Sequence, residues 1–186
     1  MGSRDQLPTF PVGNHERFME YALEQAQKSP PGDNKFCVGA VLVDADKGQV
    51  LSTGYSLEYP RDYNGDPGTT HAEQCCFIKI ADANKLTEQE IYKVLPRNTV
   101  LYTTMEPCNE RLSKNMTCAT RIIRLKGAVN TVYVGIREPG TFIKNNDGQK
   151  RLEAHGIKVE YPVEHMKDRI TEISLAGHPP SSQELL

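Results

Sequence analysis

The chain has 186 residues, a length that suits a single domain with modest tails. It carries 22 Lys and Arg against 24 Asp and Glu, and this near balance argues against a polybasic nucleic-acid binder or a protein held to a membrane surface by charge. The longest apolar runs, such as Cys37–Val43, are too short to cross a bilayer. The chain begins without the apolar core of a secretory signal, and its five cysteines are an odd number. Metal binding or catalysis is therefore favoured over a disulfide framework, and the expected compartment is the cytoplasm.

Three stretches of different character divide the chain. Residues 1–13, which are rich in proline and glycine, are expected to form a flexible N-terminal arm, and residues 176–186 a polar C-terminal tail. The intervening residues 14–175 are expected to fold as one domain, in which hydrophobic periodicity distinguishes helices from strands. In chain order, this periodicity predicts a helix over 15–28 after an Asn14 cap, a hairpin of strands over 37–43 and 49–57, a loop over 58–70, a helix over 71–83 and a short helix from Thr87.

From Asn98 onward, strands alternate with helices. The pattern predicts strands over 99–104, 129–136 and 157–163, helices over 118–126 and 147–154, and a last amphipathic helix built on Val163, Met166, Ile170 and Ile173. An antiparallel hairpin followed by such units predicts a mixed sheet between two layers of helices. The expected fold is therefore of the α/β class, a three-layer α-β-α arrangement around a five-stranded mixed sheet.

Four residues at segment boundaries predict a zinc site with a carboxylate beside it. His71 lies where the long loop gives way to a helix, Cys108 just after the strand over 99–104, and Cys118 at the start of the next helix. One imidazole and two thiolates provide three ligands and leave the fourth position open for water, as a catalytic zinc requires. Glu73, two residues after His71, can face that water without being a ligand. This combination is typical of zinc deaminases, in which such a glutamate carries protons.

The remaining cysteines and histidines are expected to lie outside this site. Cys37 belongs to an apolar strand, and Cys75 and Cys76 occupy the middle of a helix among apolar residues, so all three are predicted to be core residues. The other histidines have no cysteine or carboxylate at ligand spacing and are interpreted as surface or packing residues: His15, His155, His165 and His178.

Several segments resemble known deaminases. His71-Ala-Glu-Gln74 and Thr103-Thr-Met-Glu-Pro-Cys108 resemble the cytidine-deaminase-like superfamily in general. Nine residues separate Cys108 from Cys118, where nucleoside and tRNA deaminases usually have two, and an insert of this length is similar to that of the deaminases of riboflavin biosynthesis. The resemblance covers roughly residues 14–163. It is greatest to the fungal members of that family, the diaminohydroxyphosphoribosylaminopyrimidine (DRAP) deaminases, in the segments 35–44, 105–118 and 133–159.

The resemblance implies a cytidine-deaminase-like fold, a homodimer and a specific reaction. In that reaction, 2,5-diamino-6-(ribitylamino)pyrimidin-4-one 5′-phosphate is hydrolysed to 5-amino-6-(ribitylamino)uracil 5′-phosphate and ammonia. His71, Cys108 and Cys118 match the family's zinc ligands, and Glu73 matches its proton shuttle. Attack is expected at C2 of the ring, with Glu73 moving a proton to a ring nitrogen and then to the departing amine. Substrate contacts are expected from the following residues: Asn34, Ala72, Asn109, Glu110, Arg111, Lys114 and Asn145.

The phosphate of such a substrate requires cations or backbone N–H groups. Candidates are Arg111 and Lys114 in the insert, Lys144, and residues 145–150, which open a predicted helix. Glu106 has two interpretations, one in which it orients the site through hydrogen bonds and one in which it serves the fold alone.

Two alternative functions are compatible with the zinc pattern. The first is another base, nucleoside, nucleotide or tRNA deaminase of the same superfamily, although a nucleic-acid substrate would favour a basic tract that this sequence lacks. The second is a non-catalytic zinc scaffold, which the presence of Glu73 argues against. The expected cofactor is therefore Zn²⁺ and the expected partner a phosphorylated pyrimidine, without nucleic acid or membrane.

Overall fold

The structure is a computed structural model, and it describes residues 7–59, 66, 69–142 and 146–179. Lys144, Asn145, most of the loop over 58–70 and the tail from residue 180 lie outside the described residues. The strands within them are β1 (Gly39–Asp44), β2 (Gln49–Tyr55), β3 (Thr99–Met105), β4 (Val129–Ile136) and β5 (Lys158–Glu160). The helices are α1 (His15–Ala26), α2 (Ala72–Asn84), α3 (Cys118–Arg124), α4 (Gly148–Ala154) and α5 (Lys167–Ser174), with 3₁₀ helices η1 (Glu88–Lys93) and η2 (Glu164–Met166).

The strands form one mixed sheet in the order β2-β1-β3-β4-β5. β1 pairs antiparallel with β2 and with β3, whereas β3 with β4 and β4 with β5 pair in parallel. Every residue of β1 and β3 is buried because helices cover both faces of these central strands, whereas the edge strand β2 alternates buried and half-buried residues. The expected α/β fold with a five-stranded mixed sheet is confirmed.

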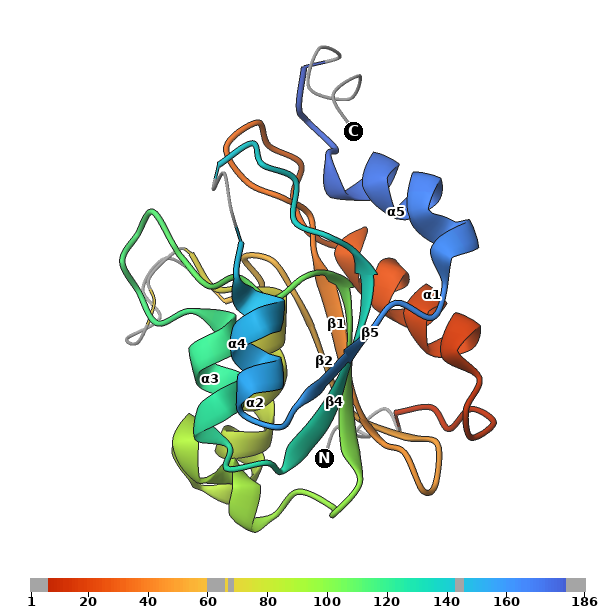
Figure 1. The fold of residues 1–186 in the computed structure, drawn as a ribbon, viewed down its shortest axis with the longest axis vertical. Helices are drawn as coiled ribbons and strands as arrows, with labels where there is room; N and C mark the ends of the chain where they lie inside the picture. The colour runs from red at the N-terminus through yellow and green to blue at the C-terminus, as the bar shows by residue number, and fades with distance from the viewer. Residues whose placement is uncertain (1–6, 60–65, 67–68, 143–145, 180–186) are drawn as a thin grey trace, which may run out of the picture.

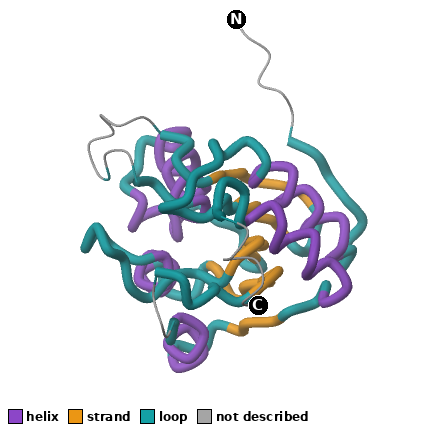
Figure 2. The backbone as a smooth tube through the Cα atoms, turned by 90° about the horizontal axis from the view of Figure 1, so that it is seen from above, coloured by secondary structure: helices purple, strands orange, loops and turns teal. Residues whose placement is uncertain are grey.

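Helices lie on both faces of the sheet. α1 and α5 cover one face, and α2, α3 and α4 cover the other (Figures 1 and 2). A side chain at Gly39 would lie 1.9 Å from the Ala22 carbonyl oxygen of α1, and one at Gly54 would lie 2.1 Å from the Ala72 carbonyl oxygen of α2. Glycine is therefore required at both positions, and it allows the first turn of α2 to lie directly against β2.

Two helix starts have side-chain caps, of which the cap at Asn14 was predicted from the sequence. The Asn14 side chain accepts a hydrogen bond from the Arg17 N–H (3.1 Å) at the start of α1. At the start of α3, the Thr117 hydroxyl accepts one from the Thr120 N–H (3.3 Å). Such caps satisfy backbone donors that have no partner inside the helix, so they fix where each helix begins.

Three predicted elements differ from those observed. The first strand begins at Gly39 rather than Cys37, because the Cys37 N–H bonds the Ser174 carbonyl (2.9 Å) instead of a neighbouring strand. The helix predicted from Thr87 is the 3₁₀ helix η1. The last strand is only three residues long, since it is an edge strand that pairs with β4 alone. No helix among the described residues has the length and apolar character needed to span a membrane.

Candidate functional site

The fold brings His71, Cys108 and Cys118 together at one end of the sheet. His71 precedes α2 as its N-cap, Cys108 follows β3, and Cys118 is the first residue of α3. The His71 Nδ1 atom lies 3.5 Å from each of the two Sγ atoms, and all three ligating atoms lie within 4.8 Å of one another. Within the part of the chain that the structure describes, these three side chains are the ones that lie close enough together to hold a metal ion.

The spacing of these atoms fits zinc. Zn–S bonds of about 2.3 Å and a Zn–N bond of about 2.0 Å, at tetrahedral angles, place the ligand atoms roughly 3.5–3.8 Å apart. The observed Nδ1–Sγ separations of 3.5 Å agree with this geometry. Two thiolates and one imidazole are also a donor set that zinc prefers, and three ligands leave a coordination position for water.

The start of α3 stabilises one of the two thiolates. The Cys118 N–H donates a hydrogen bond to the Cys108 Sγ (3.4 Å), as expected for a sulfur next to the positive end of a helix. Hydrogen bonding from Cys118 lowers the pKa of Cys108 well below its usual range despite the burial of the sulfur, and His71 contributes to the shift. The shared hydrogen bond with Cys108, together with burial, raises the pKa of Cys118. Cys108 is therefore readily deprotonated, as coordination of a metal ion requires.

Glu73 lies next to this cluster in the first turn of α2. Its side chain is buried, and its Oε2 atom accepts a hydrogen bond from the Cys118 Sγ at 3.3 Å. Burial raises the pKa of the carboxyl group, and the negative charge of Cys108 raises it further. A carboxyl group that binds a proton more readily than usual, beside a metal site, has the properties of a proton carrier.

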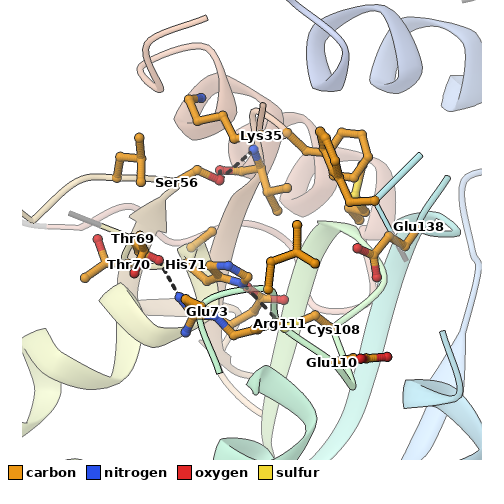
Figure 3. Close-up of a pocket in the computed structure, with 18 of the residues that line it drawn as sticks. Lys35, Ser56, Thr69, Thr70, His71, Glu73, Cys108, Glu110, Arg111 and Glu138 are labelled. Carbon is orange, nitrogen blue, oxygen red and sulfur yellow. Dashed lines mark hydrogen bonds between the residues drawn. The ribbon is translucent and has the colours of Figure 1, made fainter. Parts of the chain in front are cut away.

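A pocket opens beside the cluster and shows which of the expected substrate residues can meet a ligand (Figure 3). Asn34, Ala72, Glu110 and Arg111 line it, together with His71, Glu73 and Cys108. The other lining residues are Lys35, Phe36, Val38, Ser56, Leu57, Thr69, Thr70, Met105, Glu106, Leu112, Ser113, Glu138 and Phe142. The expected contact at Asn145 lies outside the described residues.

Two of the expected substrate residues are placed away from the pocket. The Asn109 side chain turns toward α4, where its Oδ1 atom accepts a hydrogen bond from the Arg151 guanidinium (3.0 Å). Lys114 is exposed at the tip of the insert, in a left-handed backbone conformation with φ of 60°. Neither residue is part of the pocket lining, although their neighbours Glu110, Arg111, Leu112 and Ser113 in the insert are.

Arg111 lines the pocket, but its guanidinium group is paired with Asp66. One nitrogen lies 2.6 Å from the Asp66 carboxylate, and another donates to the Thr69 carbonyl (2.6 Å), a contact visible in Figure 3. Asp66 also accepts a hydrogen bond from Asn115 at 2.5 Å. Burial alone would raise the pKa of Asp66, but hydrogen bonds from Thr69, Arg111 and Asn115 and the charge of Arg111 lower it overall. Arg111 thus joins the insert to the segment before His71, and its guanidinium group is already paired with a carboxylate, while the predicted contact with a phosphate stays a prediction.

Glu106 has the orienting contacts that the sequence left open. Its two carboxyl oxygens accept hydrogen bonds from the backbone N–H groups of Gln149 (3.3 Å) and Glu138 (3.5 Å). Burial raises the pKa of this carboxyl group, and both hydrogen bonds oppose the shift. Glu106 therefore joins the end of β3 to the segment after β4 and to the start of α4.

The sequence analysis missed two pocket residues with ionisable side chains, Lys35 and Glu138. Lys35 lies between the end of α1 and the start of β1, and its ammonium group donates to the Ser29 hydroxyl (2.8 Å). Glu138 follows β4, which runs parallel to β3. Since parallel strands end at the same edge of a sheet, a charged residue just after β4 has a position equivalent to that of Cys108 after β3. The order of the strands thus gives the position of Glu138, but not the orientation of its side chain.

The predictions that the other three cysteines are core residues and that His178 is a packing residue are confirmed. Cys37, Cys75 and Cys76 are buried. Burial raises the pKa of the Cys75 thiol to about 12 and that of Cys76 well above its usual range, so neither is a reactive thiolate. His178 is a packing residue, with its ring stacked on Phe36 at a centroid separation of 5.5 Å.

Comparison with known proteins gives concordant matches. Residues 12–136 match the family described as the cytidine and deoxycytidylate deaminase zinc-binding region. The chain is 39% identical over 167 residues to a diaminohydroxyphosphoribosylamino-pyrimidine deaminase of Schizosaccharomyces pombe, an alignment that covers 90% of this chain and 36% of that protein. The chain thus spans about a third of the length of this relative.

Solved structures of the Rib2 deaminase of Aspergillus oryzae resemble the whole domain. One of them, a C-terminal deletion mutant, is 36% identical to this chain with a TM-score of 0.79, covering 92% of this chain and 96% of that one. A second, in complex with DARIPP, is 35% identical with a TM-score of 0.78 and covers 92% and 94% of the two chains.

Proposed function

Because the chain belongs to the family of the cytidine and deoxycytidylate deaminase zinc-binding region, we propose that it is a zinc-dependent enzyme that deaminates 2,5-diamino-6-(ribitylamino)pyrimidin-4-one 5′-phosphate. The products are 5-amino-6-(ribitylamino)uracil 5′-phosphate and ammonia, in riboflavin biosynthesis. The relatives from S. pombe and A. oryzae support this choice of substrate within the family. The observation that carries the catalytic part of the proposal is the buried Glu73 carboxyl group, 3.3 Å from the Cys118 sulfur of the ligand cluster.

Each of the four central residues has a defined chemical part in this proposal. Zinc held by His71, Cys108 and Cys118 supplies a Lewis acid that makes water acidic enough to react near neutral pH. In the reaction, the oxygen of water bonds to C2 of the ring, and the bond from C2 to its amino group breaks. Glu73 takes one proton from the water and passes it to a ring nitrogen. It then takes the second proton from the hydroxyl group now on C2 and gives it to the departing amine, which leaves as ammonia while C2 becomes a carbonyl carbon. The raised pKa of Glu73 suits both transfers.

The pocket supplies the rest of the proposed binding site. Asn34, Ala72 and Glu110 contact the substrate from the pocket wall, and Arg111 acts through Thr69, whose carbonyl it holds. Lys35 is the better cation for the phosphate, since its ammonium group bonds the Ser29 hydroxyl and Cys37 sulfur rather than a carboxylate among the described residues. We further propose that the enzyme acts in the cytoplasm as a homodimer.

The test is ammonia release from this substrate by the zinc-loaded protein and by a Glu73→Gln variant. Glutamine has nearly the same size but cannot carry a proton, so release should fall about 100- to 10,000-fold while zinc stays at one per chain. A Glu172→Gln variant, in which the altered side chain is exposed on α5, serves as the matched control with an unchanged rate.

Two outcomes would count against the proposal. Equal ammonia release by the wild type and Glu73→Gln would remove the assigned role of Glu73. No release by a wild-type protein that contains zinc would overturn the substrate but not the metal site. Cytosine, guanine, their nucleosides and tRNA would then be the substrates to compare, and inactivity on all of them would favour a zinc scaffold.

A further inference from the structure

Glu138 occupies the pocket wall beyond Cys108. β4 ends at Ile136, and Glu138 follows two residues later, at the same edge of the sheet as the ligand cluster. Its carboxyl group is half-buried and lines the pocket, on the other side of Cys108 from Glu73 in Figure 3. The position therefore brings a carboxyl group to the cavity without making it a metal ligand.

Asn146 fixes this carboxyl group in one orientation. Its Nδ2 atom donates to the Glu138 Oε2 atom (2.7 Å) and to the Pro107 carbonyl (3.2 Å). Its Oδ1 atom accepts from the N–H groups of Asn109 (3.1 Å) and Gly148 (2.9 Å). These backbone contacts determine which way the Asn146 amide faces, so the nitrogen must point to Glu138. One oxygen of Glu138 is thereby occupied, and the other has no hydrogen-bond partner among the described residues.

The other acidic residues of the pocket do not offer an equivalent acceptor. Glu73 lies against the ligand cluster and is assigned to proton transfer. Both oxygens of Glu106 accept hydrogen bonds from backbone N–H groups. Glu110 is exposed, so water competes for its oxygens. Of the four, Glu138 alone combines a fixed orientation, partial burial and an oxygen left for a ligand.

The electrostatic surroundings of Glu138 show what ligand would stabilise it. Burial raises the pKa of its carboxyl group to about 8, and the negative charges of Cys108, Glu106 and Glu73 contribute. The ionised form is therefore poorly solvated, and N–H donors from a ligand would replace the missing water. At neutral pH the unliganded carboxyl group is therefore largely protonated, and an N–H donor from a ligand favours the ionised form, in which the free oxygen accepts a hydrogen bond.

We propose that Glu138 is a specificity-determining residue, whose free carboxyl oxygen accepts a hydrogen bond from an N–H group of the aminopyrimidine ring. This inference rests on the proposed function, since the substrate of that reaction carries several amino and ring N–H groups. Asn146 is a positioning residue for this contact. A ring that presented a carbonyl oxygen at this wall would lack this hydrogen bond, which distinguishes amino-substituted pyrimidines from the counterparts that carry a carbonyl group in place of the amino group.

Replacement of Glu138 by glutamine tests the contact, because Asn146 controls how the new amide is oriented. The Asn146 Nδ2 atom requires an acceptor, so the glutamine oxygen must face Asn146 and its NH₂ group must face the pocket. Glu138→Gln thus converts the pocket-facing acceptor into a donor with little change in volume. The expected result is a KM for the proposed substrate raised about 10- to 100-fold, with a smaller change in kcat, unchanged zinc content and unchanged Tm.

Matched variants distinguish this role from lost packing and from failure of the proposed reaction. Glu172→Gln should leave KM unchanged, and Glu138→Asp, which keeps a carboxylate, should raise KM less than Glu138→Gln does. A KM within twofold of wild type for Glu138→Gln, or equal losses for the aspartate and glutamine variants, would overturn the inference while wild-type ammonia release still supported the proposed function. Absence of ammonia release by the wild type itself would instead overturn the proposed function.

Discussion

Helices α1 and α5 cover a face of the sheet that contains stacked aromatic rings, whereas α2, α3 and α4 cover the other face, where the ligand cluster lies at the edge of the sheet (Figure 1). On the α1 face, Tyr102 stacks on Phe18 and on Tyr133 with ring centroids 4.9 Å and 4.7 Å apart. Across the sheet, the buried side chains near the site include Glu73 and the ion pair of Asp66 with Arg111. Both faces thus have an apolar core, but the ligand face also contains buried charges near the site that satisfy one another.

The contrast indicates which substitutions should affect catalysis and which should affect folding alone. A buried charge is tolerated only while its partner is present. If one partner is removed, the other stays buried without a counter-charge and still bears the free-energy cost of leaving water. The stability that aromatic packing contributes does not depend on a charged partner. When such a side chain is truncated, the loss of stability increases with the volume removed. Substitutions of the two kinds should therefore give similar losses of stability but different losses of activity.

The largest expected effect is that of removing a metal ligand. Cys118→Ser should leave the protein with less than one zinc per chain and reduce ammonia release by more than about 100-fold. The loss should exceed that for residues that only support metal ligands, whose substitution lowers metal affinity or activity by about 10- to 100-fold. Metal analysis and ammonia release on the same preparation check this prediction. A Cys118→Ser protein with full zinc content and normal turnover would show that the cluster of His71, Cys108 and Cys118 is not the catalytic centre.

Asp66→Asn should disturb stability and the pocket together. The change leaves the Arg111 guanidinium buried without its counter-charge, a loss of roughly 3–5 kcal/mol in the free energy of unfolding at neutral pH. Because the pKa of Asp66 is lowered on folding, its contribution is present above the ordinary aspartate pKa of about 3.9 and is lost as the pH falls below it. The difference in Tm between wild type and variant should accordingly shrink between pH 6 and pH 3. Asp82→Asn, on the exposed side of α2, is the control, and an unchanged Tm for Asp66→Asn would refute the prediction.

Phe18→Ala should lose about as much stability as Asp66→Asn, while its activity stays that of the wild type. Phe18 is fully buried on the α1 face, and truncation of such a side chain costs about 3–5 kcal/mol. Zinc content and KM should remain those of the wild type at temperatures where the variant is folded, as measured by chemical unfolding, metal analysis and kinetics. A raised KM together with full zinc content would contradict the separation of the two faces.

The sequence predicted those parts of the molecule that depend on local patterns. His71, Cys108 and Cys118 each lie at a boundary between elements, so their positions at the edge of the sheet follow from the order of strands and helices. The cap at Asn14 and the apolar run of β1 are likewise local features. The zinc cluster and the three-layer fold were therefore predictable before any contact was known.

Contacts between distant segments were not predictable in this way. Arg111 looked like a phosphate contact because its buried partner, Asp66, is 45 residues away in the chain. Glu138 has no local sign of function, since its oriented carboxyl group depends on Asn146 and on the packing of β4 beside β3. The short last strand also reflects tertiary structure, because an edge strand continues only as far as its single neighbour can pair with it.

The smallest expected effect belongs to Tyr102→Phe, which tests whether the two faces are independent within one strand. The Tyr102 hydroxyl bonds the His15 Nδ1 atom at 2.8 Å. Burial raises the pKa of Tyr102, and so the phenol stays neutral and contributes a hydrogen bond rather than a charge. The phenylalanine ring retains the stacking, and His15 is only half-buried, so water can replace its lost partner. The free energy of unfolding should fall by about 0.5–1.5 kcal/mol, and Tm by about 1–6 °C.

Activity is the informative readout for this variant, because β3 carries Tyr102 on the α1 face and leads directly to Cys108. If the strand is as rigid as its pairing on both sides suggests, the loss of one hydrogen bond at its middle should leave kcat/KM within twofold of the wild-type value. A fall of tenfold or more, with Tm lowered by only a few degrees, would mean that movement on the α1 face reaches the ligand cluster through β3. The separation of folding from chemistry would then hold for the helices but not for the strand that they share.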